Sequence, residues 1–369
     1  MDERYLGRAL ELAKKAWGET HPNPMVGAVI VENNEIVSEG YHTRAGLRHA
    51  EIIALENLSR LPSSDAVLYV TLEPCSTRGQ TGSCVEAIIK AGFSRVVVGA
   101  LDPNPVHAGR GLDELREAGI DVCKVEGPLA EDCLNLNLIF NYQIVRKQPF
   151  FALKLAVTKD SKIAEHHGQS SVITGEKARA DVMRWRRLFP AIAIGAGTVI
   201  ADDPCLTSRL PGGEWCPRRI ILDGKLSSVP ERGNLPKVYS DNFCENTLVV
   251  TDKASSVDYI RRARLIEAGV TIRELRLDSG GNYSYSKLRE ILAEEDLTGV
   301  YFEGGAKVAH QILREKAVDY LFWYQSPKTF PNADAVEVPS LADFPLPEKV
   351  QSTKLGEDLL IRGFLNFSN

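Results

Sequence analysis

The sequence predicts an α/β protein of two domains, and three observations lead to that prediction. The chain has 369 residues, which is long for one domain but enough for two that each bury a core. Short apolar runs alternate with stretches of helical period in both halves. A polar joint, Arg146-Lys147-Gln148-Pro149, separates the halves, and the pattern restarts after it. We therefore expect domains over residues 1–146 and 147–369.

The composition is that of an ordinary soluble globular protein. Hydrophobic residues make up 44% of the chain, charged residues make up 25%, and the net charge is −5. A protein that binds nucleic acid usually has a basic face, so nucleic acid is not expected as a partner. No apolar run is long enough to span a membrane, and the first residues do not resemble a secretory signal. Seven cysteines in this setting are typical of reduced thiols, so we expect a cytoplasmic protein.

The first half is expected to alternate helices and strands around one sheet. An amphipathic helix opens the chain, with apolar residues at helical spacing at Leu6, Leu10, Ala13 and Trp17. The expected strands are 25–31, 35–40, 66–72, 95–100 and 120–125. The further expected helices are 49–58, 85–91, 112–118 and 129–142.

The second half is expected to form a doubly wound, mostly parallel sheet. The expected strands are 150–157, 191–195, 219–222, 248–251, 270–275 and 299–302. The expected helices are 176–188, 257–268, 285–295 and 307–314. Two late runs, 320–325 and 358–364, are expected to add edge strands, which could be antiparallel. Ligands of such sheets bind beyond the carboxyl ends of the strands.

The residues that can carry chemistry in the first half lie between His49 and Cys84. His49-Ala50-Glu51 begins a helix, Cys75 follows a strand, and Cys84 opens another helix. One imidazole and two thiolates suit Zn²⁺ with a fourth position open for water, and Glu51 suits a proton shuttle. The pattern therefore predicts a zinc deaminase with Glu51 as its catalytic residue. The alternatives are two buried cysteines or a structural zinc site, for which a fourth ligand is missing here.

Two segments of the second half could bind a cofactor or a phosphate. Glu303-Gly304-Gly305-Ala306 lies at a strand-to-helix turn, where backbone amides can approach a phosphate. Taken alone, such a Gly-Gly pair is more often a tight turn. Residues 197–209 bring a hydroxyl, two carboxylates and an arginine into one loop. The alternative for this loop is a capped turn with Asp202 or Asp203 as the N-cap.

Two arginines of the second half could bind a substrate phosphate. Arg186 lies on the expected helix 176–188, and Arg209 lies in the 197–209 loop. A guanidinium binds phosphate through two parallel hydrogen bonds, so the two arginines could form a clamp. The alternative is that Arg186 is an exposed helix residue.

Short motifs in both halves carry a resemblance to a known family. Those of the first half are His21-Pro22-Asn23-Pro24-x-Val26-Gly27, His42-x₆-His49-Ala50-Glu51, Glu73-Pro74-Cys75-x₈-Cys84 and Asp102-Pro103-Asn104-Pro105. Those of the second half are Leu153-Lys154-Leu155-Ala156, Ile173-Thr174, Gly197-Thr198-Val199-x-Ala201-Asp202-Asp203-Pro204-x-Leu206-Thr207-x-Arg209 and Glu303-Gly304-Gly305. With these motifs in order, the chain resembles, almost end to end, the bifunctional riboflavin-biosynthesis deaminase–reductases.

This resemblance implies a cytidine-deaminase-like domain over 1–146 and a dihydrofolate-reductase-like domain over 147–369. The first would remove the 2-amine of a 2,5-diamino-6-ribosylamino-4-pyrimidinone 5′-phosphate with the help of Zn²⁺. The second would use NADPH to reduce the ribosyl group of the product to ribityl. The expected partner is thus a small phosphoribosylaminopyrimidine, with no nucleic acid and no membrane, and a homo-oligomer is expected.

The resemblance also implies roles for individual residues. The zinc ligands would be His49, Cys75 and Cys84, with Glu51 as the proton shuttle. The deaminase substrate would contact Asn23, His42 and Asn104. The cofactor would contact Ala156, Val172, Thr198, Asp202 and Gly305. The reductase substrate would contact Lys154, Ser170, Arg186, Leu206, Arg209 and Glu303.

The chain departs from the family pattern at a few positions. Between the zinc cysteines, Thr77 and Gln80 stand where the family usually has a histidine and a basic residue. In the second half, Ser161 and Val172 stand where glycine and tryptophan are usual. We expect Arg78 to supply the missing basic contact. The alternatives are a reductase with an impaired deaminase domain, an enzyme for a related aminopyrimidine, and a non-catalytic zinc- or nucleotide-binding module.

Overall fold

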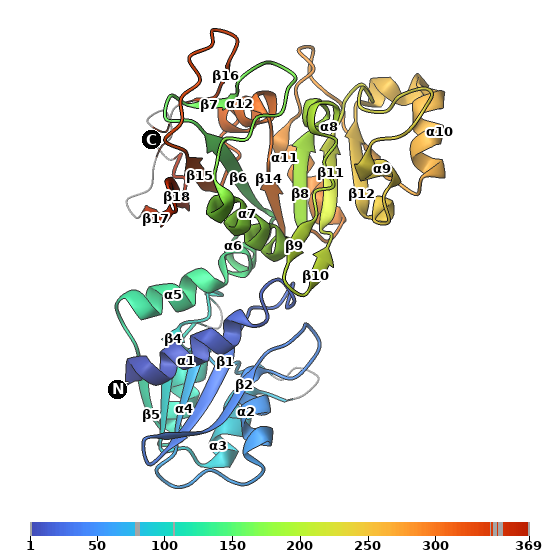
Figure 1. Cartoon of the computed structure of the whole chain (residues 1–369). Coiled ribbons are helices and arrows are strands. Elements are labelled where there is room, and N and C mark those ends of the chain that lie inside the picture. Colours follow the sequence, from blue (N-terminus) through green and yellow to red (C-terminus); the bar gives the residue numbers. More distant parts are fainter. Residues whose placement is uncertain are drawn as a thin grey trace. The chain divides into compact units, whose positions relative to one another are not determined.

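The chain passes from one folding unit to the next after Lys147. This residue ends a helix in the left-handed conformation, with φ 56°, and a new sheet begins at Phe150. The computed structural model divides here into two units, Met1–Lys147 and Gln148–Asn369 (Figure 1). It describes residues 2–77, 82–105, 108–339, 341, 345 and 350–367. The boundary expected from the sequence lies one residue before this division.

The N-terminal unit is built on one mixed sheet. Its strands are β1 Gly27–Glu32, β2 Glu35–Tyr41, β3 Val67–Leu72, β4 Arg95–Ala100 and β5 Asp121–Lys124. Its helices are α1 Asp2–Lys14, α2 Ala50–Leu58, α3 Cys84–Ala91, α4 Arg110–Glu117, α5 Pro128–Leu136 and α6 Leu138–Arg146. The strand order is β2-β1-β3-β4-β5, antiparallel from β2 to β3 and parallel from β3 to β5. This order brings the carboxyl ends of β3 and β4 to the same edge of the sheet.

Helices cover both faces of this sheet (Figure 1). Apolar side chains of α2, α3 and α4 form a core with alternate strand residues such as Ile30, Leu68 and Val96. The helices α1 and α5 pack on the opposite face. A Cβ at Gly40 would collide with the backbone of Ala50 in the first turn of α2. Glycine at this position therefore lets α2 pack closely against β2.

The chain has two helices where the sequence predicted a single helix over 129–142. It breaks at Asn137, between α5 and α6, where φ is −110° and ψ is 40°. The buried Asn137 side chain accepts a hydrogen bond from the Met25 N–H at 2.7 Å and donates one to the Met25 carbonyl at 3.0 Å. These bonds join residues 112 positions apart and hold Asn137 at the break between the two helices. The prediction of one helix was therefore wrong.

The C-terminal unit carries a larger sheet. Its main strands are β6 Phe150–Val157, β8 Ala191–Gly195, β11 Arg218–Leu222, β12 Thr247–Thr251, β13 Thr271–Glu274, β14 Gly299–Phe302, β15 Tyr320–Gln325, β17 Gln351–Leu355 and β18 Asp358–Phe364. Its short strands are β7 Lys162–Ala164, β9 Ser208–Leu210, β10 Gly213–Trp215 and β16 Val336–Glu337. Its helices are α7 Glu176–Leu188, α8 Ala196–Asp202, α9 Lys237–Ser240, α10 Tyr259–Glu267, α11 Tyr285–Glu294 and α12 Ala306–Arg314, with 3₁₀ turns η1 Cys244–Asn246 and η2 Lys253–Val257. Among the described residues, no helix combines the length and apolar character that a bilayer span requires.

The strand order of this sheet is β13-β12-β11-β8-β14-β6-β15-β18-β17. Neighbours from β13 to β15 are parallel, whereas β18 and β17 are antiparallel, so the predicted α/β class with a mostly parallel sheet is confirmed. The expectation that β15 and β18 lie at the edge was wrong, because β17 adds to β18 and forms that edge. The sequence did not reveal β17 because its side chains are mostly exposed and show no apolar alternation.

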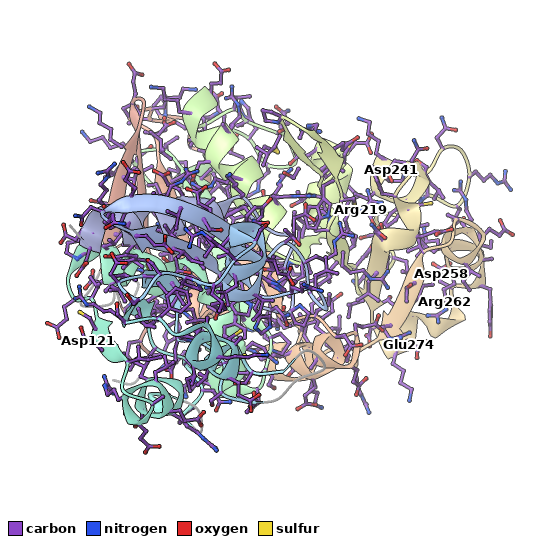
Figure 2. All side chains as sticks on the ribbon, turned by 90° about the horizontal axis from the view of Figure 1, so that it is seen from below. Asp121, Arg219, Asp241, Asp258, Arg262 and Glu274 are labelled. Atoms are coloured by element: carbon purple, nitrogen blue, oxygen red, sulfur yellow. The ribbon has the colours of Figure 1, made fainter. Side chains whose placement is uncertain are left out.

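Charged side chains pair between the outer elements of the C-terminal unit (Figure 2). Arg219, on β11, is fully buried and donates two hydrogen bonds to Asp241 at 2.6 and 2.9 Å. Arg262 of α10 pairs with Glu274 of β13 at 2.9 Å. The Asp258 side chain caps α10 by accepting a hydrogen bond from the backbone of the first turn at 3.1 Å. The Arg262–Glu274 pair thus joins α10 to β13, at one end of the strand order, and Arg219 joins β11 to the C-cap of α9.

Candidate active sites

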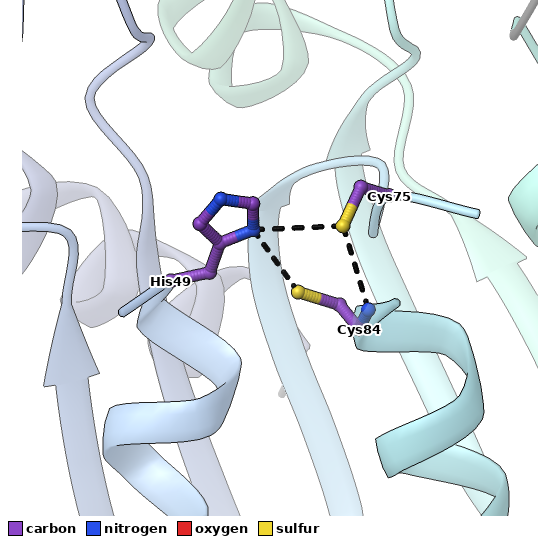
Figure 3. A group of neighbouring side chains, drawn as sticks. All are labelled: His49, Cys75 and Cys84. Atoms are coloured by element: carbon purple, nitrogen blue, oxygen red, sulfur yellow. Dashed lines mark hydrogen bonds between the residues drawn. The ribbon is translucent and has the colours of Figure 1, made fainter. Parts of the chain in front are cut away.

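Three potential metal ligands converge in the N-terminal unit (Figure 3). His49 is the N-cap of α2, Cys75 follows β3, and Cys84 is the first residue of α3. The Nδ1 atom of His49 lies 3.2 Å from the Sγ atom of Cys84 and 3.5 Å from that of Cys75. The backbone N–H of Cys84 also donates to the Cys75 sulfur at 3.4 Å. All three ligand atoms lie within 4.8 Å of one another, and no second group of this kind occurs in the described part of the chain.

This donor set fits zinc. Bond lengths of about 2.3 Å to sulfur and 2.0 Å to nitrogen in a tetrahedral site place donor atoms about 3.5–3.8 Å apart, close to the separations found here. The pKa of Cys75 is lowered to about 4, because Cys84 and His49 form hydrogen bonds to its sulfur. The N-terminal ends of α2 and α3 add positive potential that favours thiolates. A structural site would use a fourth protein ligand, and this cluster has three.

Glu51 lies in the first turn of α2, two residues after His49, and is 3% exposed. Burial raises the pKa of its carboxyl, and its own backbone N–H and the charge of His49 offset this only in part. A carboxyl whose pKa is raised by burial accepts a proton more readily than an exposed carboxyl does. Its place beside the three donors therefore suits acid–base chemistry better than a structural zinc site.

His42 and Asn23 form a pair next to this cluster. The His42 Nδ1 atom lies 3.0 Å from the Arg48 carbonyl oxygen, which can only accept, so Nδ1 carries the proton. The Nε2 atom then accepts from the Asn23 amide at 3.3 Å. Burial lowers the pKa of His42, which favours the neutral ring. Its ring lies edge-on to that of His49, with 5.5 Å between centroids, so the expected substrate contacts Asn23 and His42 adjoin the metal cluster.

The sequence suggested no role for Glu73, yet its carboxylate binds the stretch that carries Asn104. Its Oε2 atom accepts from the N–H groups of Asp102 and Gly109 at 3.1 and 2.9 Å, and Oε1 accepts from Gly111 at 3.0 Å. Asp102 in turn accepts from the Asn104 N–H at 2.8 Å. Because β3 and β4 are parallel, this stretch begins at the same sheet edge as the metal ligand after β3. The only local signal for Glu73 was its position between a strand end and Pro-Cys.

The loop between the two cysteines is described only in part. Thr77, which replaces the usual histidine, is exposed. Arg78 and Gln80 lie outside the described residues. The expectation that Arg78 supplies the basic contact therefore stays a prediction.

In the C-terminal unit, three charged side chains meet where the parallel strands end. Arg186 on α7 donates from Nε and Nη2 to the two carboxylate oxygens of Glu303 at 2.6 and 3.0 Å. The Lys154 Nζ atom lies 3.8 Å from the Glu303 Oε2 atom. β6 makes its last pair with β14 at Leu153 and continues to Val157, so Lys154 and Ala156 border the end of β14. The structure thus brings together three of the expected substrate contacts. Two of them, Arg186 and Glu303, are 117 residues apart in the sequence.

This cluster has two cations and one carboxylate. Burial acts to raise the pKa of Glu303, but Arg186 and Lys154 together hold it below its usual value. Burial lowers the pKa of Lys154, and Arg186 adds to this shift. The fork of Arg186, which the sequence suggested as a phosphate clamp, binds Glu303 in this structure. Its Nη1 atom donates to the Thr207 carbonyl at 3.1 Å, which ties the cluster to the segment that holds Leu206 and Arg209.

Two expected cofactor contacts, Thr198 and Gly305, lie side by side. A Cβ on Gly305 would be 3.5 Å from the Thr198 hydroxyl. Gly305 is the N-cap of α12, and Gly195 is the N-cap of α8, and neither helix has a side-chain cap hydrogen bond. The N–H groups at the start of α12 can therefore bind an anionic group. Ala156 lies on the same face of β6 as Lys154.

The segment expected to be a loop contains the helix α8. Asp203 is its C-cap, with φ 40°, so the interpretation of Asp203 as an N-cap was wrong for this turn. Its carboxylate instead accepts from the Lys237 N–H, at the start of α9, at 2.8 Å. Asp202 is exposed in the last turn of α8. Leu206 is buried, and its φ of 56° turns the chain toward β9.

The other expected contacts lie outside the cluster of Lys154, Arg186 and Glu303. Ser170 is exposed, and Val172 is 70% exposed with its carbonyl accepting from Lys328 Nζ at 2.9 Å. Arg209 is exposed on β9, which packs against α7. Its exposure leaves the guanidinium accessible to a ligand from solvent.

Comparison with known protein families finds matches to both units. The model of the RibD C-terminal domain matches residues 149–361, and that of the cytidine and deoxycytidylate deaminase zinc-binding region matches residues 1–100. The riboflavin biosynthesis protein RibD of Bacillus amyloliquefaciens is 38% identical over 365 residues, which cover 97% of this chain and 95% of that protein. RibD of Escherichia coli K12 is 36% identical over 334 residues, 89% of this chain and 88% of that protein.

Solved structures show the same similarity over both units. The crystal structure of a diaminohydroxyphosphoribosylaminopyrimidine deaminase/5-amino-6-(5-phosphoribosylamino)uracil reductase from Thermotoga maritima is 34% identical, with a TM-score of 0.78 over 99% of both chains. RibD of Acinetobacter baumannii, form 1, is 32% identical, with a TM-score of 0.76 over 99% of this chain and 98% of that one. The likeness is thus to whole two-domain proteins.

Proposed function

This chain belongs to the RibD family of bifunctional deaminase–reductases of riboflavin biosynthesis, and we propose both of its substrates and the residues that act on them. The N-terminal unit hydrolyses the 2-amine of 2,5-diamino-6-(5-phosphoribosylamino)pyrimidin-4(3H)-one. The C-terminal unit then reduces the ribosyl side chain with NADPH to give 5-amino-6-(5-phosphoribitylamino)uracil. The observation that carries the proposal is the convergence of His49, Cys75 and Cys84 beside the buried Glu51.

In the deaminase, the three converging side chains hold Zn²⁺, which when bound activates water as a Lewis acid. Glu51 would accept a proton from the attacking water and pass it to the leaving amine. Its buried carboxyl is suited to carry the proton between these two steps, because burial makes the protonated form accessible. Asn23, His42 and Asn104 bind the pyrimidine. Because His42 bonds to the Arg48 carbonyl through Nδ1 and to the Asn23 amide through Nε2, it holds that amide in one orientation for the substrate.

In the reductase, the N–H groups at the start of α12 and the Thr198 hydroxyl bind NADPH, which when bound supplies a hydride. The cofactor contacts are Ala156, Val172, Thr198, Asp202 and Gly305. Lys154 and Glu303 contact the ribosyl chain, and Arg186 holds the Glu303 carboxylate in one orientation through two hydrogen bonds. Ser170, Leu206 and Arg209 contact the rest of the substrate. Arg209, which is exposed, binds the 5′-phosphate.

The roles at the zinc site can be tested with Glu51→Gln. The matched control is Glu117→Gln, an exposed glutamate on α4 of the same unit. Glu51→Gln should keep about one zinc per chain, because all three ligands remain, and should lose about a hundredfold or more in ammonia release. Its reduction of the deaminated intermediate should equal that of the wild type. Zinc loss in Glu51→Gln, or normal ammonia release, would contradict the assigned roles.

The proposal also includes cytoplasmic residence and self-association of the chain. Size-exclusion chromatography with light scattering measures the mass of the purified enzyme. A multiple of the single-chain mass is expected, and the mass of one chain at micromolar concentration would contradict self-association.

A further inference from the structure

The Glu73 carboxylate joins two parts of the N-terminal unit that are distant in sequence. It begins the turn Glu73-Pro74-Cys75 and is 7% exposed. One of its oxygens accepts from the N–H groups of both Asp102 and Gly109, and the other accepts from Gly111. Three backbone donors thus converge on a single side chain. These three hydrogen bonds replace the water molecules that the carboxylate loses on burial.

The start of α4 depends on this carboxylate. Its N-cap, Gly109, has φ 82° and no side chain, so it cannot cap the helix itself. Glu73 supplies the missing acceptor from another part of the chain and places a negative charge at the positive end of the helix. A Cβ on Gly111 would lie 2.5 Å from the Pro74 carbonyl oxygen, so α4 also packs directly against the turn. Hydrogen bonds and close packing therefore join the same two segments.

The same carboxylate controls the residues just before α4. Its bond to the Asp102 N–H holds the first residue of the stretch 102–105, and Asp102 accepts from the N–H of Asn104 at 2.8 Å. The Glu73 N–H donates to the Ala100 carbonyl at 2.8 Å, which extends the pairing of β3 and β4 up to this point. Asn104 is thus held in place from the turn that also carries Cys75.

We propose that Glu73 is a positioning residue of the deaminase: it holds Asn104 at the zinc site and so sets the affinity for the pyrimidine. This inference rests on the proposed deaminase function. Glu73 needs no contact with substrate or metal in this role. The role requires both carboxylate oxygens, because a glutamine offers one acceptor oxygen and would turn its NH₂ group toward at least one of the three N–H donors.

The test compares Glu73→Gln with Glu117→Gln, the same change at an exposed position of α4. Ammonia release, zinc content and backbone hydrogen exchange are measured on the full-length enzyme, and reduction of the deaminated intermediate reports the integrity of the other unit. Glu73→Gln should raise the deaminase KM about tenfold or more, with kcat changed less than about threefold and zinc retained. The amides of Asp102, Gly109 and Gly111 should exchange faster. Glu117→Gln should match the wild type in every measurement.

A second variant perturbs the same junction from the other side. Gly111→Ala places a methyl group against the Pro74 carbonyl and should also raise KM more than it lowers kcat. Unchanged KM in both variants, or loss of zinc and kcat with KM unchanged, would overturn the inference, because Glu73 would then act only on folding or on the metal. If the wild type releases no ammonia from the diaminopyrimidinone phosphate, the proposed function itself fails. Hydrogen exchange does not depend on the reaction. Slower or unchanged exchange at the three amides in Glu73→Gln would therefore overturn the inference whether or not the wild type releases ammonia.

Discussion

Replacing Glu303 by glutamine removes the carboxylate that lies between two buried cations. Arg186 and Lys154 have side chains that are 13% and 16% exposed, and that of Glu303 is 9% exposed. Lys154 can lose its proton, since its pKa is already lowered, whereas the arginine cannot. Removal of one partner from a buried ion pair typically destabilises a protein by about 3–5 kcal/mol. Because some solvent reaches this cluster, we expect Glu303→Gln to lower the free energy of unfolding by about 3 kcal/mol.

A double-mutant cycle separates this effect from the loss of packing. Arg186→Met removes the cation whose charge would be left unpaired, so Arg186→Met/Glu303→Gln should be more stable than Glu303→Gln by about 1 kcal/mol or more. Three of the four tryptophans, Trp185, Trp215 and Trp323, lie in the C-terminal unit, so their fluorescence in urea follows its unfolding.

The same variants report on activity. Glu303→Gln should lose reductase activity and keep ammonia release, whereas Glu290→Gln, an exposed control on α11, should behave as the wild type does. If the Glu303→Gln variant had the same free energy of unfolding as the wild type, this reasoning would be refuted. A double variant whose destabilisation equals the sum of those of the two single variants would refute it as well.

Three further predictions concern other parts of the chain. Residues 148–369 alone should fold, as judged by circular dichroism, and should oxidise NADPH with the deaminated intermediate, because every strand of the larger sheet lies within them. Arg209→Ala should raise the reductase KM for the phosphorylated substrate by about tenfold or more and leave that for NADPH nearly unchanged, since a charge-assisted bond is worth about 1.5–3 kcal/mol. Hydrogen bonds from Arg60 and the Ser63 N–H lower the pKa of Glu32 from 4.5 to about 2, so its stabilising effect should be full above pH 4.5 and lost as the pH falls toward 2. The difference in urea stability between the wild type and Glu32→Gln, followed by circular dichroism, should shrink over that pH range.

The cluster of His49, Cys75 and Cys84 could be predicted from the sequence because its residues are local signals. His49 and Glu51 lie two residues apart, and Cys75 and Cys84 each adjoin the end of a strand or the start of a helix. The edges of an α/β sheet bring such positions together whatever the length of the intervening chain. The strands of the two larger sheets other than β17 were also predicted, because buried parallel strands are nearly continuous apolar runs, whereas the short strands β7, β9, β10 and β16 were not.

The contacts that the sequence did not reveal join polar residues far apart in the chain. Nothing local distinguishes Asn137 from a helix residue, because its partner, Met25, is 112 residues away. Arg186 and Glu303 are 117 residues apart, so no local pattern indicates that they pair. Both were expected as separate substrate contacts, and the sequence did not suggest that one orients the other. Glu73 is recognisable only through backbone donors 29 to 38 residues away. Such contacts depend on the tertiary arrangement, which no periodicity encodes.

The most direct test of the account measures both reactions in one sample. Purified enzyme is given the diaminopyrimidinone phosphate with NADPH, and ammonia release and NADPH oxidation are followed together. We expect one ammonia and one oxidised NADPH for each substrate consumed, and ammonia alone when NADPH is left out. After zinc removal, the diamino substrate should give neither product, while the deaminated intermediate should still be reduced. Oxidation of NADPH without ammonia release, or ammonia release that never leads to NADPH oxidation, would contradict the account.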